Sequence, residues 1–159
     1  MKLNRTNSDD PDFRELVIQL DDYLADVDGE DHAYYAQFNG LDDIAHVVVG
    51  YDEGEPVGCG AFKSYTDEVA EIKRMFVRPE FRGRQIGSLV LEELEKWARD
   101  AGFTSCVLET GRKQVAAVKL YQNSGYDVIP NYGQYAGVAG SVCMRKEIAL
   151  EQKAKVQVQ

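Results

Sequence analysis

The segment from Val69 to Ser88 constrains the fold of this chain more than any other. Residues 69–77 (VAEIKRMFV) are rich in β-branched and large apolar side chains, as strands are. Pro79 follows, and because it has no N–H to donate, it ends the hydrogen-bond ladder of the strand. A glycine-containing turn then leads into apolar residues at helical spacing. The segment therefore predicts a strand, a turn and a helix in immediate succession.

The predicted turn also has the features of an anion site. The first N–H groups of a helix have no partner inside the helix, and the positive end of the helix dipole adds to their attraction for an anion. Five basic residues lie within twelve positions here, although the 159-residue chain has a formal net charge of −9. They are Lys73, Arg74, Arg78, Arg82 and Arg84. The alternative is a solvated basic turn that binds nothing.

Length and composition limit the class of protein. The 159 residues fit one domain, which we place at residues 1–148, followed by a frayed tail at 149–159. No run of about 18 apolar residues is present, so the sequence predicts no membrane span. Polar residues follow the first five, which predicts no secretory signal. The negative charge argues against nucleic-acid binding and mildly favours a cationic substrate.

The three cysteines, Cys59, Cys106 and Cys143, lie far apart and in strand-like runs. Their number is odd, and their spacing matches no metal-ligand motif. We therefore predict buried free thiols in a reducing cytoplasm, and no metal site.

Hydrophobic periodicity gives the order of the elements. Strands are predicted at 2–5, 44–51, 57–65, 69–77, 105–110, 126–129 and 141–148. Helices are predicted at 11–28, 86–101 and 114–123, with a shorter helix or an irregular turn at 30–39. The three strands between residues 44 and 77 form an antiparallel meander, and the helix after them is a crossover to a parallel strand. The result is an α/β layout with an antiparallel first half.

Three motifs within this layout carry a family resemblance. They are Arg82-x-x-Gln85-x-Gly87 between strand and helix, Leu108-Glu109-Thr110, and Ala117-x-x-Leu120-Tyr121-x-x-x-Gly125-Tyr126. Over about residues 44–148 the chain resembles the GNAT superfamily of acyl-CoA-dependent N-acetyltransferases. The resemblance implies a GNAT-like fold of the mixed α/β (α+β) type, with a central, mostly antiparallel twisted sheet of about seven strands flanked by four helices. Gln85 stands where the pyrophosphate motif of the family has its first glycine, and a left-handed backbone there would cost glutamine roughly 1 kcal/mol.

The resemblance implies a site for acetyl-CoA as co-substrate. The end of the strand before the turn, Met75, Phe76 and Val77, would hydrogen-bond the pantetheine arm through its backbone. The turn would wrap the pyrophosphate with Arg82, Gly83, Arg84, Gln85, Ile86, Gly87 and Ser88. Backbone N–H groups and an arginine suit that doubly charged group. Gln114 matches a position where the family often has an asparagine in contact with the cofactor.

Two residues are candidates for the proton transfers that amine acetylation needs. Tyr121 matches the tyrosine that faces the cofactor sulfur and can act as general acid; the alternative is a buried ring whose hydroxyl bonds to the backbone. Glu71 lies where some members of the family, histone acetyltransferases among them, carry a catalytic glutamate, and it is the candidate base. The alternatives are an ion pair of Glu71 with Lys73 or Arg74, His32 as the base, or a chain of waters without a dedicated base.

The acceptor pocket is expected between the first two helices and the loop at 130–140. Its candidate wall residues are Tyr35, Asn131, Tyr132 and Tyr135. The acidic balance and the tyrosines indicate a small-molecule amine as partner, with no nucleic acid and no membrane, and they leave a homodimer open.

Two functions fit these residues. The first is an N-acetyltransferase that moves an acetyl group from acetyl-CoA to a primary amine by direct attack in a ternary complex. The second is a non-catalytic acyl-CoA-binding sensor or interaction module. Glu71 and Tyr121 favour the enzyme. A nucleotide phosphate loop is a weaker third reading, since the pattern Gly-x-x-x-x-Gly-Lys-Ser/Thr is absent.

Overall fold

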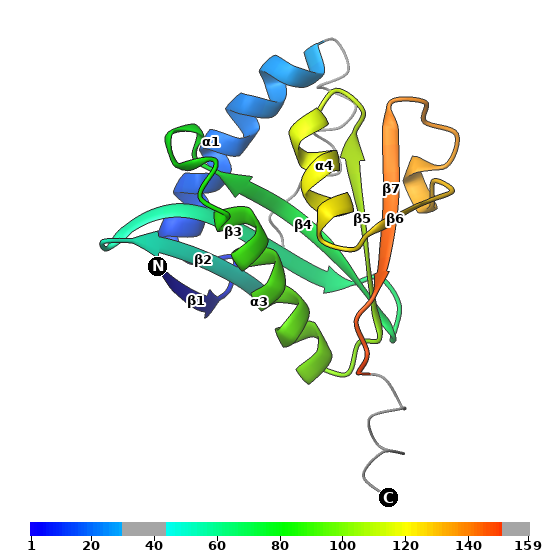
Figure 1. Cartoon of the computed structure of the whole chain (residues 1–159), viewed down its shortest axis with the longest axis horizontal. Coiled ribbons are helices and arrows are strands. Elements are labelled where there is room, and N and C mark those ends of the chain that lie inside the picture. The colour runs from blue at the N-terminus through cyan, green and yellow to red at the C-terminus, as the bar shows by residue number, and fades with distance from the viewer. Residues whose placement is uncertain (30–43, 151–159) are drawn as a thin grey trace, which may run out of the picture.

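Seven strands form one mixed sheet in the computed structural model, which describes residues 1–29 and 44–150 (Figure 1). The strands are β1 (Lys2–Thr6), β2 (His46–Asp52), β3 (Glu55–Ser64), β4 (Val69–Val77), β5 (Ser105–Gly111), β6 (Asp127–Ile129) and β7 (Ser141–Glu147). Their spatial order is β1-β2-β3-β4-β5-β7-β6, and every neighbouring pair is antiparallel except β4 and β5. The predicted fold class is confirmed. The element expected at 30–39 and residues 151–159 of the tail lie outside the described residues.

Helix α1 (Pro11–Asp28) covers one face of the sheet. The carboxylate of Asp10 caps it, accepting hydrogen bonds from the N–H groups of Asp12 at 2.9 Å and Phe13 at 3.2 Å. The helix buries Phe13, Leu16, Val17 and Leu20 against apolar side chains of β2, β3 and β4. Burial of this stripe is what holds α1 on the sheet.

Helices α3 (Ile86–Asp100) and α4 (Val115–Asn123) pack on the opposite face and lie in front of the sheet in Figure 1. The buried face of α3, centred on Val90 and Leu94, contacts the core residues Phe62 and Ile72 of β3 and β4. The predicted thiols Cys59, Cys106 and Cys143 are free and buried in the sheet, as expected.

Strands β4 and β5 pair over only part of their length. The parallel register joins Val69, Ala70 and Glu71 to Ser105, Cys106 and Val107, and it stops there. Strand β4 nevertheless continues to Val77, and β5 continues to Gly111 along β7. The two strands therefore separate toward their carboxyl ends, which leaves an opening in the middle of the sheet (Figure 1).

A β-bulge in β4 lies beside this opening. The register with β3 shifts by one residue, from Ala61 opposite Lys73 to Cys59 opposite Phe76, and Arg74 takes the left-handed value φ +59°. Gly60 faces the bulge. A Cβ at Gly60 would collide with Met75 Sδ and come within 2.8 Å of Leu94 Cδ1, so only glycine lets the bulged strand approach α3 this closely.

The buried side chain of Arg74 turns toward α1, where its Nη1 lies 3.1 Å from Asp21 Oδ1. This ion pair ties the bulge to the helix on the α1 face. Met75, the next residue along β4, packs on the opposite face with the α3 and α4 cluster. The bulge thus places Arg74 on the α1 face and Met75 on the α3 face, both beside the opening in the sheet.

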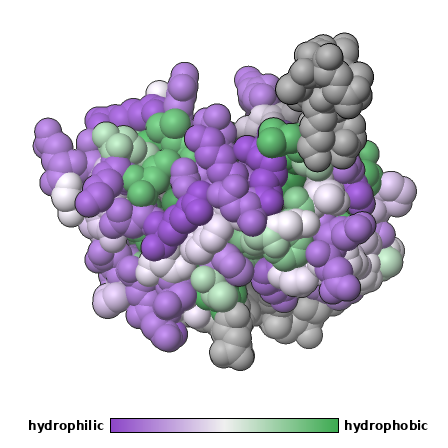
Figure 2. All heavy atoms as spheres, turned by 90° about the horizontal axis from the view of Figure 1, so that it is seen from below, coloured by the Kyte–Doolittle hydropathy of each residue, from purple (hydrophilic) through white to green (hydrophobic). Residues whose placement is uncertain are grey.

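Figure 2 shows one face of the molecule, on which hydrophilic residues dominate and apolar residues form small separate groups. The exposed large apolar side chains come from different elements, for example Ile18 in α1, Val115 in α4 and Val128 in β6. None of the helices within residues 1–29 and 44–150 is long and apolar enough to cross a membrane.

Candidate active site

A pocket of about 270 Å³ opens at the carboxyl end of β4, between α1, α3 and α4. Its walls are Leu20, Tyr23, Met75, Phe76, Val77, Phe81, Arg82, Gly83, Gln85, Ile86, Gly87, Ser88, Gln114, Ala116, Ala117, Leu120 and Tyr121. Every residue of the predicted cofactor set except Arg84 lies in this wall, and so does Tyr121. The structure therefore brings the strand end, the turn and the α4 residues to one cavity.

The turn presents the start of α3 to the pocket. The first hydrogen bond of the helix runs from Leu89 N–H to the carbonyl of Gln85, at 3.1 Å. The N–H groups of Ile86, Gly87 and Ser88 precede it, belong to the first helical turn and have no acceptor within the helix. These residues line the pocket, so the helix end offers it the donors and the positive dipole end that suit an anion.

Gln85 caps α3 in a left-handed conformation, with φ 62° and ψ 19°. This is the conformation for which glycine is favoured, and here a residue with a Cβ holds it. The departure from the family's glycine therefore leaves the turn geometry in place and carries a strain that glycine would not have.

We expect Gln85→Gly to raise the free energy of unfolding by up to about 1 kcal/mol, because glycine relieves the left-handed strain by more than it adds to unfolded-chain entropy. Urea denaturation measures this change. Gln85→Ala is the matched control, since alanine removes the amide but keeps the Cβ, and it should give no such gain. Equal free energies of unfolding for the glycine and alanine variants would contradict the claim that the backbone at residue 85 is strained.

The basic residues of the turn have separate partners. Arg82 lines the pocket, with its Nε 3.3 Å from the carbonyl oxygen of Val77 and its guanidinium 4.9 Å from the centre of the Tyr23 ring. Lys73 and Arg74 lie further back in β4 and face carboxylates there. Of the five basic residues, Arg82 is thus the one placed to meet an anion in this cavity.

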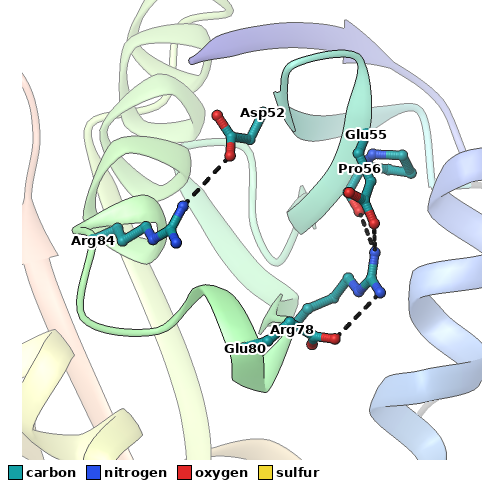
Figure 3. A network of polar contacts seen from close by, with 6 residues as sticks. All are labelled: Asp52, Glu55, Pro56, Arg78, Glu80 and Arg84. Atoms are coloured by element: carbon teal, nitrogen blue, oxygen red, sulfur yellow. Dashed lines mark hydrogen bonds and ion pairs between the residues drawn. The ribbon is translucent and has the colours of Figure 1, made fainter.

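Figure 3 shows the other two arginines held by acidic residues. Arg84, which is 60% exposed, has its Nη1 3.5 Å from Asp52 Oδ2. Arg78 contacts Glu55 at 2.6 Å and Glu80 at 3.4 Å. The carboxylates from the hairpin of β2 and β3 therefore draw both arginines away from the pocket wall, and a cofactor role for Arg84 would require it to leave Asp52.

We expect Arg82→Ala to weaken acetyl-CoA binding about tenfold, which corresponds to losing a hydrogen bond to a charged group of about 1.5 kcal/mol. Arg84→Ala removes the same charge from the same turn but not from the pocket, so its dissociation constant should rise less. Calorimetric titration of acetyl-CoA into each variant measures both. Equal losses for the two variants would show that only the net charge of the turn matters.

Tyr121 lies on α4 at the inner end of the pocket and is 7% exposed. Its ring packs edge-on against Tyr126, with centroids 5.9 Å apart. Burial raises the pKa of the Tyr121 hydroxyl, and the negative charge of Glu109 adds to the effect. The phenol is therefore a neutral hydrogen-bond donor throughout the physiological range of pH.

Glu71 lies outside the pocket wall, on the α1 face of β4, and is 3% exposed. Its Oε2 accepts a hydrogen bond from the hydroxyl of Tyr132 at 2.7 Å, and its Oε1 lies 3.7 Å from Lys73 Nζ. The ion pair with Lys73 that the sequence suggested is thus present, whereas Arg74 pairs with Asp21 instead. Burial lowers the pKa of Lys73, and the charge of Glu71 works against that shift.

The predicted acceptor residues fall into different surroundings. Tyr132 and Tyr135 pack edge-on with centroids 5.7 Å apart, near Glu71. The amide of Asn131 donates to the carbonyl oxygens of Val138 and Ser141, and Asn131 borders a separate groove beside β6. Tyr35 and His32 lie outside the described residues.

Sequence reasoning missed two residues that lie outside the pocket wall and support its surroundings through other residues. Tyr65 packs against Tyr132 with ring centroids 5.0 Å apart, and Asp21 holds the bulge through Arg74. Neither stands in a motif, since each acts through a partner far away in the sequence. The aromatic character of Tyr65 next to the turn of β3 and β4 was the one available signal.

Solved structures that share this fold include proteins described as N-acyltransferases and N-acetyltransferases. A Klebsiella pneumoniae protein described as a candidate acyl-CoA N-acyltransferase superposes with a TM-score of 0.77 at 28% identity, over 92% of this chain and 97% of that one. The PaiA N-acetyltransferase of Thermoplasma acidophilum, solved with coenzyme A, shares the fold with a TM-score of 0.67 at 18% identity, over 92% and 98% of the two chains.

Residues 12–126 match the acetyltransferase (GNAT) family, and the chain belongs to it. The IAA acetyltransferase of Azospirillum brasilense is 36% identical over 142 residues, which are 84% of this chain and 89% of that protein. The chain is thus an acyltransferase of the GNAT type, as the motifs of the turn and of α4 predicted.

Proposed function

We propose that this protein transfers the acetyl group of acetyl-CoA to a primary amine of a small molecule, by direct attack in a ternary complex. The observation that carries the proposal is that the end of β4, the start of α3 and Tyr121 line the same pocket. The Thermoplasma protein that shares the fold binds coenzyme A, which supports the same cofactor class here.

Acetyl-CoA would lie with its pyrophosphate at the start of α3, where Arg82 and unpaired N–H groups meet. Its pantetheine arm would follow the backbone of Met75 and Val77, whose strand has lost its β5 partner at this level. An arm of this kind adds a strand-like partner to the free edge, as extended ligands do. The sulfur would then approach Tyr121.

The reaction needs a neutral amine and a stabilised thiolate. The amine nitrogen attacks the thioester carbon, and backbone N–H groups near Met75 would stabilise the oxyanion that forms. The carbon–sulfur bond then breaks, the thiolate takes its proton from the Tyr121 hydroxyl, and the amine's proton passes to Glu71 directly or through water. The products are an N-acetyl amine and coenzyme A.

The acceptor is proposed as a small amine that reaches the thioester from the α1 face. The net charge of −9 favours a cationic compound over an anionic one, and Tyr132 and Tyr135 offer aromatic surface to it. The three free, buried cysteines support a reducing compartment, the cytoplasm, as the place where the protein works.

Two measurements test the proposal. Calorimetry with acetyl-CoA establishes binding, and a thiol-release assay follows turnover with an alkylamine, an arylalkylamine, a polyamine, an amino-acid ester and a lysine peptide. IAA, named in the Azospirillum relative, is tested beside them. We expect binding and release of one thiol per acetylated amine for at least one small amine. Tight binding without release for any acceptor would support a non-catalytic acyl-CoA-binding module instead.

A further inference from the structure

The hydroxyl of Tyr132 and the carboxylate of Glu71 meet although they come from distant parts of the chain. Tyr132 donates to Oε2 at 2.7 Å, while Lys73 Nζ lies 3.7 Å from Oε1. Each carboxylate oxygen thus has its own partner, and contacts of this charge-assisted kind are the strong ones. A buried carboxylate held at both oxygens has a fixed orientation.

We propose that Tyr132 is a positioning residue, which keeps the Glu71 carboxylate aimed for accepting the amine proton. The inference rests on the proposed function, in which Glu71 is the base. The sequence suggested only that Tyr132 lines the acceptor pocket. The inference goes further, because the hydroxyl of Tyr132 donates its hydrogen bond to Glu71 and not to the acceptor.

Tyr132 is itself held in place. Its ring packs edge-on against the rings of Tyr65 and Tyr135, with centroids 5.0 Å and 5.7 Å away. Asn131, its neighbour, bonds through its amide to the carbonyl oxygens of Val138 and Ser141 and so closes the loop on itself. Packing of the ring therefore directs the Tyr132 hydroxyl toward Glu71. Because Tyr132 is itself fixed, it can in turn fix the Glu71 carboxylate.

Tyr132 also stays a donor at neutral pH. Burial raises the pKa of its hydroxyl, and the charge of Glu71 and the hydrogen bond to it raise the pKa further. The hydrogen bond from Tyr132 to Glu71 therefore keeps its donor proton at neutral pH.

Other ionisable groups surround Glu71. They are Lys63 of β3, which is its cross-strand partner, Lys73 and Arg74 of β4, Glu109 of β5, Cys143 of β7, and Tyr132 and Tyr135 of the loop. Tyr132→Phe leaves all of them except its own hydroxyl unchanged. A difference between the kcat values of the two proteins then reports on that hydroxyl.

The test uses the primary amine from the panel that gives the highest kcat/KM with the wild type. In Tyr132→Phe the carboxylate loses the donor that aims it, so kcat should fall about tenfold, which corresponds to losing a hydrogen bond to a charged group. Acetyl-CoA affinity measured by calorimetry should not change. Tyr65→Phe removes a hydroxyl from the adjacent ring but keeps the ring that packs on Tyr132, and it should keep the wild-type kcat.

A double-mutant cycle with Glu71→Gln separates positioning from a wall role. If Tyr132 acts through Glu71, Tyr132→Phe should have little further effect in the Glu71→Gln background. A full additional loss of kcat there would overturn the proposal while leaving Glu71 as the base. If Glu71→Gln alone leaves the pH–rate profile unaltered, Glu71 is not the base, and Tyr132 then has no positioning role.

Discussion

Tyr121→Phe is expected to lower kcat about 100-fold while leaving acetyl-CoA affinity nearly unchanged, since positioned general acids contribute at least this much. The variant keeps the ring that packs against Tyr126 and removes only the proton that the leaving thiolate would take. Because burial raises the pKa of Tyr121, the hydroxyl stays protonated to high pH, and wild-type activity should show no loss from its ionisation near neutrality.

Tyr23→Phe is the matched control for this variant. Tyr23 also lines the pocket, yet its ring supports Arg82 and its hydroxyl has no part in the proposed proton transfer. Stopped-flow thiol release and calorimetry on both variants give the rate and the affinity separately. A Tyr121→Phe enzyme with unchanged kcat would remove the acid role and leave Tyr121 as a packing residue.

Glu71→Gln is expected to lower kcat/KM by about 100-fold at neutral pH and to flatten the acid limb of the pH–rate profile. Glutamine is nearly isosteric and can still accept from Tyr132, so the fold should survive while the proton acceptor is lost. The substitution removes the negative charge 3.7 Å from Lys73 Nζ, so the unfolding free energy of the variant must be measured beside its rate.

An unaltered pH profile for Glu71→Gln would point to a chain of waters as the base. The result would leave acetyl transfer and the cofactor pocket intact, because Glu71 does not line that pocket. Thiol release between pH 5.5 and about 9.5, measured with one amine for wild type and variant, covers both limbs of an ordinary acid–base profile.

Local patterns predicted much of the fold. The apolar spacing placed α1 at its observed ends, and the run from Val69 to Val77 did the same for β4. These features depend on neighbours in the sequence, which is why they could be read from it. The turn motif likewise named the wall residues between Arg82 and Ser88, with Arg84 as the exception, because a helix start presents its own consecutive residues to one point.

Contacts between distant segments were out of reach. Nothing in the residues around Arg74 predicts a left-handed backbone for an arginine, since the bulge depends on Gly60 of β3 and Asp21 of α1. The basic residues also looked like one cluster. Asp52 and Glu55 divide them, and those carboxylates reach the turn only after β2 and β3 pair with β4.

The path of a labelled acetyl group tests the central claim most directly. The protein is incubated with acetyl-CoA carrying ¹³C in both acetyl carbons and with the amine panel, and mass spectrometry follows the label in the amines and in the intact protein. Direct transfer predicts that the label appears on the amine nitrogen, with one coenzyme A released for each acetyl group and no lasting label on the protein. Acetyl-CoA that binds but leaves every amine unlabelled would contradict the account.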